Sequence, residues 1–298
     1  MVYIDSFVFP SDDDINGYFY QLYPWNIFFE NGFKSLVCKD ITIFYGNNGS
    51  GKSTLLNILS EKIEAQRDEK LFKDVVYMPQ DHGEVEVHPF DDFLSKTHYK
   101  MGLDDSGERY LLPQFRKVIT SEDIFRKIDN RRRHNNKALL DIDRKRNKRN
   151  EIVNKGYQYK GIDDYDDLLN LLEARKLSKG EYANRYAESK EKMQSNGETA
   201  LSIYSSSFED GGIYFLDEPE NCLSPVFQIE LIDLILQSSK YFDCQFFIST
   251  HSPLLLSLKN AVVYNLDARP VIEQDWTTLE NVLIYYDFFM AHKGEFEK

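Results

Sequence analysis

The chain has 298 residues, a hydrophobic fraction of 42% and a formal net charge of −13. This length suits one large domain or a core with an inserted lobe, and the 21 Phe and 19 Tyr residues argue against a disordered chain. The net negative charge argues against a protein that binds nucleic acid or an anionic membrane over its whole surface, but it is compatible with a local basic patch.

Cysteines and termini point to the cellular compartment. Cys38, Cys222 and Cys244 are scattered and lack metal-site spacing, which is typical of reduced thiols in a cytoplasmic protein. The first residues lack the basic flank and apolar core of a signal peptide. Apolar runs such as residues 213–216 are too short for a bilayer span, which needs about 20 residues. We therefore expect a cytoplasmic chain without its own membrane span.

The residue pattern of the sequence changes twice along the chain. Residues 1–90 alternate short β-like runs with one helix-like stretch, and residues 196–298 return to that α/β pattern. Residues 91–195 between them are charged and mostly helical in pattern. We expect an α/β fold, with a parallel P-loop sheet core from 1–90 and 196–298 and an inserted helical lobe at 91–195. The β-like runs are 3–4, 7–9, 26–29, 41–45, 75–78, 212–216 and 244–249, and the helical runs are 52–64 and 227–237.

A phosphate-binding motif follows the β-like run at 41–45. Residues 46–53 fit the pattern G-x-x-x-x-G-K-S/T completely, and an amphipathic helix pattern begins at Thr54. Glycines let such a loop point its N–H groups at phosphate oxygens, and the helix N-terminus adds a favourable dipole. Lys52 is expected to reach the β- and γ-phosphates, and the Ser53 hydroxyl to ligate Mg²⁺. The expected nucleotide-binding residues are Gly46, Asn47, Asn48, Gly49, Ser50, Gly51, Lys52, Ser53 and Thr54.

A basic segment lies in the central lobe. Residues 122–155 contain twelve Lys or Arg and six Asp or Glu, a net charge of +6 within an acidic chain. One interpretation is a helical arm that contacts phosphate backbones or an acidic partner, with nucleic acid binding through residues 126–149. The other is a solvated helical hairpin that packs against acidic neighbours such as residues 163–167. No aromatic base-stacking pattern accompanies the charges, so sequence-specific recognition is not supported.

A second catalytic element is the acidic end of an apolar run. Ile213 to Leu216 are four apolar residues, followed by Asp217, Glu218 and Pro219. Such a run suits a buried parallel strand, and ligands of α/β folds bind at the carboxyl ends of strands. Asp217 is expected to face the metal and Glu218 to polarise the attacking water. Near the C-terminus, residues 276–289 form an aromatic helix candidate, which packs on the core or docks a partner.

The order of these motifs resembles the ATP-binding-cassette ATPases. Gln80 resembles their glutamine loop, which implies contact with Mg²⁺ and the attacking water. Residues 195–198, Ser-Asn-Gly-Glu, resemble the signature motif and precede Asp217 by the spacing of that family. Residues 221–225 lie where the family has its D-loop. His251 follows Glu218 by 33 residues and resembles the switch histidine that senses the γ-phosphate.

The signature departs from the Leu-Ser-Gly-Gly-Gln of transporter cassettes. Its Ser-x-Gly-Glu form is similar to stand-alone soluble AAA-type ATPases related to the SMC, RecF and OLD proteins. The resemblance implies a head-to-tail homodimer in which Ser195 and the Gly197 N–H cover the γ-phosphate bound by the other chain. It implies catalytic roles for Glu218, His251 and Gln80, and Mg²⁺ ligation by Ser53, Gln80 and Asp217. Tyr23 and Trp25 are either candidates to stack on adenine or core residues.

Three functions remain open. The first is that the chain is a switch driven by ATP hydrolysis, in a complex that is linked to nucleic acid and includes an effector partner. Such a complex would act in anti-phage defence or DNA repair. Alternatively, it is the ATP-binding subunit of a membrane transporter. The third possibility is a nucleotide-gated scaffold that holds an effector enzyme. The signature sequence argues against the transporter.

Overall fold

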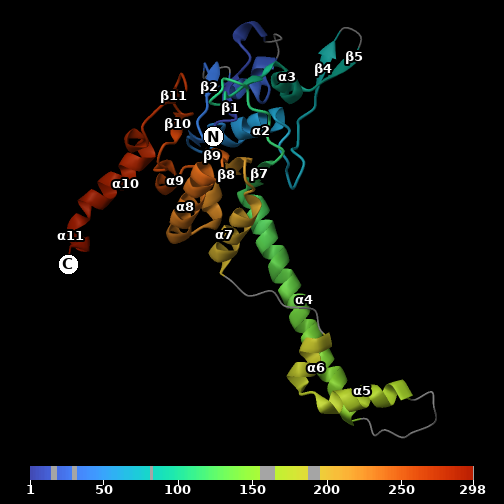
Figure 1. Cartoon of the computed structure of the whole chain (residues 1–298). Coiled ribbons are helices and arrows are strands. Elements are labelled where there is room, and N and C mark those ends of the chain that lie inside the picture. Colours follow the sequence, from blue (N-terminus) through green and yellow to red (C-terminus); the bar gives the residue numbers. More distant parts are fainter. Residues whose placement is uncertain (15–18, 29–31, 81–82, 155–164, 187–194, 298) are drawn as a thin grey trace. The chain divides into compact units, whose positions relative to one another are not determined.

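A computed structural model of the chain describes residues 1–14, 19–28, 32–80, 83–154, 165–186 and 195–297. It divides the chain into two compact units, one of Met1–Ile124 with Asn196–Lys298 and one of Phe125–Ser195. The described part of the second unit is helical (Figure 1). It holds most of α4 (Ser121–Asn154), together with α5 (Tyr165–Lys176) and α6 (Lys179–Tyr186).

A six-stranded sheet forms the centre of the first unit. Its strand order is β11-β10-β3-β9-β8-β7, and every neighbouring pair is parallel except β10 with β11. The prediction of an α/β fold with a parallel-dominated sheet is confirmed. β3 and β9 are buried along their whole length, as expected for parallel strands covered on both faces. The strands are β3 (Ile41–Tyr45), β7 (Arg116–Thr120), β8 (Ile213–Asp217), β9 (Gln245–Ser249), β10 (Val262–Asn265) and β11 (Ile272–Glu273).

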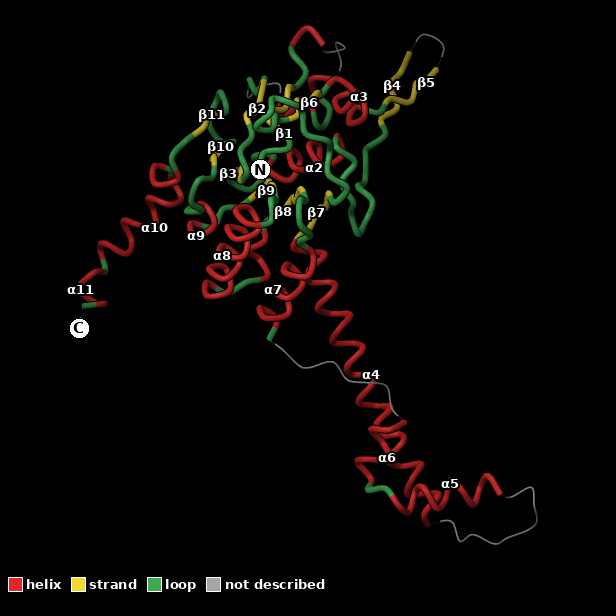
Figure 2. Tube along the Cα trace, viewed as in Figure 1, coloured by secondary structure: helices red, strands yellow, loops and turns green. Residues whose placement is uncertain are grey.

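Helices cover this sheet on both sides. Figure 2 shows α2 (Lys52–Lys62) on one side, with α7 (Asn196–Ser207) and α8 (Pro225–Tyr241) on the other. A second, antiparallel sheet of β2 (Ser35–Val37), β1 (Ile4–Val8) and β6 (His98–Met101) adds to the core. Its Phe7 ring lies 6.1 Å from the ring of Phe247 on β9, so one apolar core joins the two sheets.

The boundary of the inserted lobe differs from the expectation. Residues 91–124 fall in the first unit, because β7 pairs with β8 and β6 pairs with β1. Because these residues are highly charged, their sequence did not predict the two short strands β6 and β7. The run at 26–29 was also expected to be a strand, but Trp25–Phe28 form the helical turn α1, with Trp25 and Phe28 buried.

The remaining elements complete the first unit. β4 (Val76–Gln80) pairs with β5 (Gly83–Val87) as a separate two-stranded sheet. The aromatic candidate at 276–289 forms a 3₁₀ turn at Trp276–Thr278 and helix α10 (Glu280–Ala291), followed by α11 (Lys293–Phe296). α3 covers Pro89–Lys96 and α9 covers Pro253–Leu256, while further 3₁₀ turns lie at Asp12–Asp14, Phe19–Gln21 and Pro219–Cys222. Among the described residues, no helix has the length and apolarity of a membrane span.

Candidate active site

The glycine-rich loop joins the end of β3 to the start of α2. Gly51 has a φ of 95°, and a Cβ there would lie 2.6 Å from Ile27 Cγ2, so both backbone and space require glycine. Lys52, the first residue of α2, is only 4% exposed. Its Nζ donates hydrogen bonds to the carbonyl oxygens of Gly46, at 2.8 Å, and Asn47, at 3.2 Å. The ammonium group is therefore held inside the curve of the loop.

Asp267 holds the start of this loop. Its carboxylate accepts the Asn47 N–H with both oxygens, Oδ2 at 2.9 Å and Oδ1 at 3.1 Å. The contact arises because β10 lies parallel beside β3, so the turn after β10 meets the turn after β3. Asp267 was not predicted from the sequence; its signal would have been an acidic residue three positions after the apolar run 262–264.

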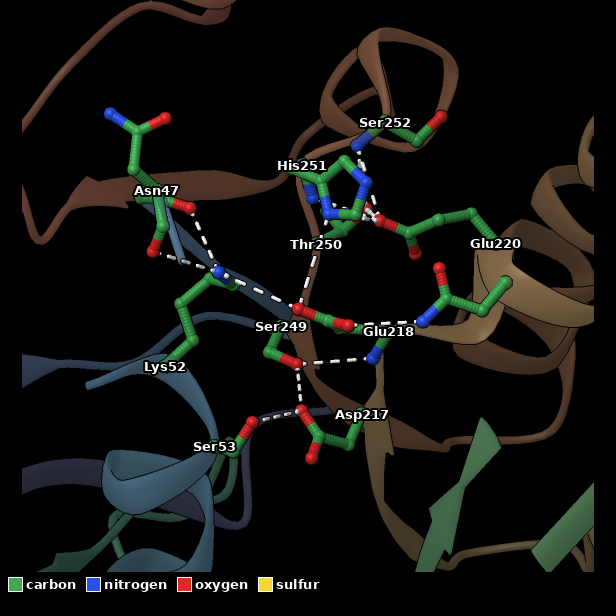
Figure 3. Close-up of polar contacts among 12 residues, drawn as sticks. Asn47, Lys52, Ser53, Asp217, Glu218, Glu220, Ser249, Thr250, His251 and Ser252 are labelled. Carbon is green, nitrogen blue, oxygen red and sulfur yellow. Dashed lines mark hydrogen bonds and ion pairs between the residues drawn. The ribbon is translucent and has the colours of Figure 1, made fainter. Parts of the chain in front are cut away.

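Ser53 and Asp217 meet although they are distant in the sequence. The Ser53 hydroxyl donates to Asp217 Oδ1 at 3.0 Å, and the Ser249 hydroxyl donates to the same oxygen (Figure 3). Burial raises the pKa of the Asp217 carboxyl, and these two hydrogen bonds oppose that rise. The ionised carboxylate is thus incompletely compensated in the protein alone. A divalent cation beside it would supply the missing positive charge.

Glu218 follows β8 in an unusual backbone conformation. Its φ of 45° and ψ of 54° lie in the left-handed region, which non-glycine residues rarely adopt and which is frequent at active sites. The turn directs the carboxylate toward the phosphate loop: Oε1 lies 3.6 Å from Lys52 Nζ. The other oxygen, Oε2, accepts a hydrogen bond from Asn221 Nδ2 at 3.0 Å. The side chain is 26% exposed, so water can reach it.

A buried carboxylate organises the turn that carries His251. Glu220 is 7% exposed, and its Oε1 accepts hydrogen bonds from the Thr250 hydroxyl at 2.6 Å and the His251 N–H at 2.9 Å. The His251 ring is 45% exposed, with Nδ1 lying 3.4 Å from Glu220 Oε1 and 4.0 Å from Glu218 Oε1. Figure 3 shows this ring above the Lys52–Glu218 pair. Glu220 was not predicted from the sequence, although it directly follows the acidic turn 217–219, and Asn221 was predicted only as the first residue of the D-loop-like segment 221–225.

The His251 turn is also tied to the C-terminal helix. Asn281, in the first turn of α10, donates from Nδ2 to the His251 carbonyl oxygen at 3.1 Å. Its backbone N–H donates to the Tyr45 hydroxyl at 3.3 Å, and Tyr45 ends β3. One residue of α10 thus contacts both the last residue of β3 and the turn that follows β9.

The residues of this site fit a magnesium-bound triphosphate. Ser53 and Asp217 offer a hydroxyl and a carboxylate oxygen, donors that hard cations such as Mg²⁺ prefer. Mg²⁺ is commonly held by one or two carboxylates together with water and substrate phosphates. Among the described residues, no cluster of three or more His, Cys, Asp or Glu is suited to a metal. Within the described chain, Ser50 Oγ is buried without a hydrogen-bond partner, as expected for an atom that faces a ligand.

A cleft adjoins the phosphate loop on the side of α1. Its volume is about 360 Å³, within the usual range for small-ligand sites. It is lined by Asn26, Ile27, residues 48–50, Leu266, Asp267 and Arg269. The adenine candidate Trp25 is wrong: its ring is 2% exposed, and its Nε1 donates to the Pro89 carbonyl oxygen at 3.2 Å inside the core. Tyr23 stacks on Phe90 at a ring distance of 6.3 Å.

Two predicted parts of the site lie elsewhere in the structure. Gln80 ends β4, in the two-stranded sheet, and its side chain lies outside what the structure describes. Ser195 directly precedes α7, and Gly197 lies in its first turn. A Cβ at Gly197 would overlap the ring of Phe227 on α8, so this glycine permits close helix packing. Figure 2 shows α7 and α2 on opposite sides of the sheet.

Known proteins give two kinds of similarity. A model of the family described as "AAA domain, putative AbiEii toxin, Type IV TA system" matches residues 60–257, which include β8, Glu218 and His251 but begin after the phosphate loop. No curated protein matches the sequence.

Solved structures are similar at low identity. The Smc head domain of Pyrococcus furiosus, bound to the C-terminal domain of ScpA, is 14% identical, with a TM-score of 0.41 and 100% of each chain covered. The SMC head domain of Thermotoga maritima is 12% identical, with a TM-score of 0.36 and coverage of 80% of this chain and 92% of that one. A dimeric ATP-binding cassette bound to ADP and Pi is 16% identical, with a TM-score of 0.34 and coverage of 82% and 90%.

Proposed function

The chain belongs to the AAA-domain family whose model it matches over residues 60–257, and from this premise we propose that it binds ATP with Mg²⁺ and hydrolyses it as a molecular switch. The observation that carries the proposal is the convergence of Lys52, Ser53, Asp217 and Glu218 at the carboxyl ends of β3 and β8. Phosphoryl transfer depends mainly on positioning and charge stabilisation, and these groups supply both.

Each group has a distinct role in the proposed reaction. Lys52 stabilises the negative charge of the β- and γ-phosphates, exchanging its present loop carbonyl partners for phosphate oxygens. Ser53 and Asp217 would hold Mg²⁺, whose positive charge would offset the negative charge that develops during phosphoryl transfer. Glu218 orients and polarises the attacking water, with Asn221 fixing its carboxylate. His251 would sense the γ-phosphate, and Gln80, whose strand β4 belongs to a separate two-stranded sheet, would have to approach the site to contact the metal and the water.

The proposed active form is a head-to-tail homodimer. Glu218 and His251 are 26% and 45% exposed in one chain, so the reacting phosphate would lie open to solvent. The first turn of α7, with Ser195 and Gly197, presents a helix N-terminus that suits an anion. We propose that this turn of a second chain covers the γ-phosphate. Hydrolysis would remove that bridging group and loosen the dimer.

The switch is proposed to act in the cytoplasm, within a complex that includes an effector partner and nucleic acid, in anti-phage defence or DNA repair. The family description names a type IV toxin–antitoxin system, which supports a partner-dependent role. The basic helix α4 supports contact with phosphate backbones: Lys137, Arg144 and Lys148 are exposed on it. Other basic residues there pair internally, as Arg133 does with Asp129 at 2.7 Å.

The decisive experiment separates binding from turnover. Glu218→Gln should keep MgATP affinity but lower kcat by about 10²- to 10⁴-fold, since it removes a general base. The same variant should accumulate as a dimer in MgATP, measured by light scattering after gel filtration. Glu230→Gln, an exposed position on α8, makes the same change of charge and should behave as wild type. Wild-type turnover by Glu218→Gln would refute the assignment of the catalytic carboxylate.

A further inference from the structure

His251 has both of its peptide groups held by side chains from other parts of the fold. Its N–H donates to Glu220 Oε1 at 2.9 Å, and its carbonyl oxygen accepts a hydrogen bond from Asn281 Nδ2 at 3.1 Å. The ring is 45% exposed, and its Nδ1 has no hydrogen-bond partner among the residues that the structure describes. The backbone of His251 is therefore fixed from two sides, whereas its ring is held less tightly.

Asn281 reaches this position because the start of α10 is anchored in the first unit. Leu279 is fully buried and Val282 is 8% exposed. Asn281 lies in the first helical turn, where backbone N–H groups have no acceptor within the helix. Its N–H donates instead to the Tyr45 hydroxyl at 3.3 Å, and Tyr45 directly precedes the phosphate loop. The backbone and the side chain of Asn281 thus connect the start of the phosphate loop to the His251 turn.

The pairing of the strands ends before it reaches His251. β3 and β9 are paired as far as Phe44 and Ser249, and the Thr250 N–H donates to the Phe44 carbonyl oxygen at 3.1 Å. His251 lies one residue beyond the last of these contacts. Its distance from the phosphate loop therefore depends on contacts outside the sheet, and the contact from Asn281 also reaches the end of β3.

From these contacts we infer that Asn281 is a positioning residue for the sensor of the γ-phosphate. The inference rests on the proposed function, in which His251 senses that phosphate. Asn281 acts through His251, because its hydrogen bond keeps the His251 peptide at a fixed distance from the loop that binds the phosphates. A sensing group that is held in place before the ligand arrives binds more tightly, since the ligand does not have to order it.

The alternative is that Asn281 only secures the start of α10. Both roles predict a less stable protein when the side-chain hydrogen bond is removed, so stability does not separate them. Their effects on nucleotide binding differ. Loss of a positioning residue weakens the binding of ATP more than that of ADP, because ADP has no γ-phosphate for His251 to contact. Loss of a purely structural residue affects both nucleotides equally.

The first test compares the affinities for ATP and ADP, with Mg²⁺, in chains that also carry Glu218→Gln to prevent turnover. Asn281→Ala removes the side-chain donor, adds no charge and keeps the backbone N–H that binds Tyr45. By isothermal titration calorimetry at one protein concentration, it should weaken ATP binding by about 3- to 10-fold, the effect of one hydrogen bond, and leave ADP binding unchanged. Asn130→Ala, at an exposed position on α4, should change neither affinity.

A second variant guards against a folding defect in the first. Asn281→Leu also lacks the donor but keeps the bulk of the side chain, and it should lower the ratio of ATP to ADP affinity to the same extent. Circular dichroism confirms that each variant is folded. An equal loss of ATP and ADP affinity, or a wild-type ratio in the folded Asn281 variants, overturns the inference.

A double-mutant cycle shows whether Asn281 acts through His251. His251→Ala alone should lower the ratio of ATP to ADP affinity, and adding Asn281→Ala should lower it no further. Additive losses in the double variant overturn the inference and leave the proposed sensor intact. A wild-type ratio in His251→Ala refutes the proposed sensor itself, and the inference with it, so the two failures are distinguishable.

Discussion

Nζ of Lys52 lies 3.6 Å from Oε1 of Glu218, although one residue opens α2 and the other follows β8. This ion pair connects the phosphate loop to the acidic turn that follows β8. The ammonium group also donates to two loop carbonyl oxygens, so it is well paired without a ligand. An incoming phosphate therefore replaces existing partners rather than filling a vacancy, and the binding free energy is the difference between the two sets.

Lys52→Ala should weaken MgATP binding by about 10- to 100-fold, because a hydrogen bond to a charged group contributes about 1.5–3 kcal/mol. Isothermal titration calorimetry measures the change. Lys34→Ala removes the same charge from an exposed position and should bind as wild type. Normal affinity in Lys52→Ala would count against the phosphate-loop assignment.

Asp217→Asn should stabilise the protein at neutral pH in the absence of Mg²⁺. The folded protein raises the pKa of Asp217 through burial, so protonation favours folding; this contribution is fully present below the unfolded pKa and is lost as pH rises through the folded pKa. The variant has no such titration. At pH values above the folded pKa of Asp217, the melting temperature of the variant should therefore exceed that of wild type. The difference between the two melting temperatures should shrink as the pH falls below the unfolded pKa.

The same variant should lose the stabilisation that MgATP gives to wild type, because Asn lacks the charge that the metal needs. Melting curves with and without MgATP, at fixed pH, separate the two effects. A variant that melts lower than wild type at neutral pH without ligand would contradict the account of Asp217 as an incompletely compensated carboxylate.

Gly197→Ala should destabilise the protein by about 1–3 kcal/mol, because its Cβ would overlap the Phe227 ring and overpack the contact between α7 and α8. Denaturant unfolding measures the loss. Gly180→Ala offers a control, since a Cβ there meets nothing within 4 Å. Adding Phe227→Leu to Gly197→Ala should recover part of the stability, and an unchanged double variant would show that the ring is not the obstacle.

Neutralising Lys137, Arg144 and Lys148 together should abolish stimulation of ATP turnover by DNA and leave basal turnover unchanged, because each phosphate contact releases a counterion. The steepness of the salt dependence should fall in parallel. Neutralising Lys34, Lys39 and Lys100, all exposed in the first unit, removes the same charge from another region. Equal loss in both triple variants, or no stimulation of wild type, would argue against α4 as the nucleic-acid contact.

Sequence patterns succeeded where local chemistry dominates. β3, α2, β8 and β9 follow from continuous apolar runs and the glycine-lysine turn, and the structure has them within a few residues of the expected bounds. β7 escaped notice because its residues 116–120 begin with Arg and Lys; it is a strand through its pairing with β8. Trp25 was misjudged since aromatic character alone does not distinguish a stacking platform from a core residue.

The supporting contacts of the site could not be foreseen for a different reason. Asp267, Glu220 and Asn281 act through pairs that depend on which strands become neighbours: β10 beside β3 brings Asp267 to Asn47, and β9 beside β8 brings Glu220 to the His251 turn. Strand order is a property of the whole fold and leaves no local pattern in the sequence. The residues proposed to contact phosphate and metal follow a motif, while those that hold them in place do not.

The hydrogen bonds of Asn281 set a limit on how far the chain can be shortened. A truncation after Val282 would delete the aromatic stretch of α10 and keep the bonds from Asn281 to His251 and Tyr45. A truncation after Leu279 would delete those bonds as well and leave the His251 carbonyl without this donor. Two shortened chains that differ by only three residues would therefore separate the loss of an apolar surface from the loosening of a catalytic turn.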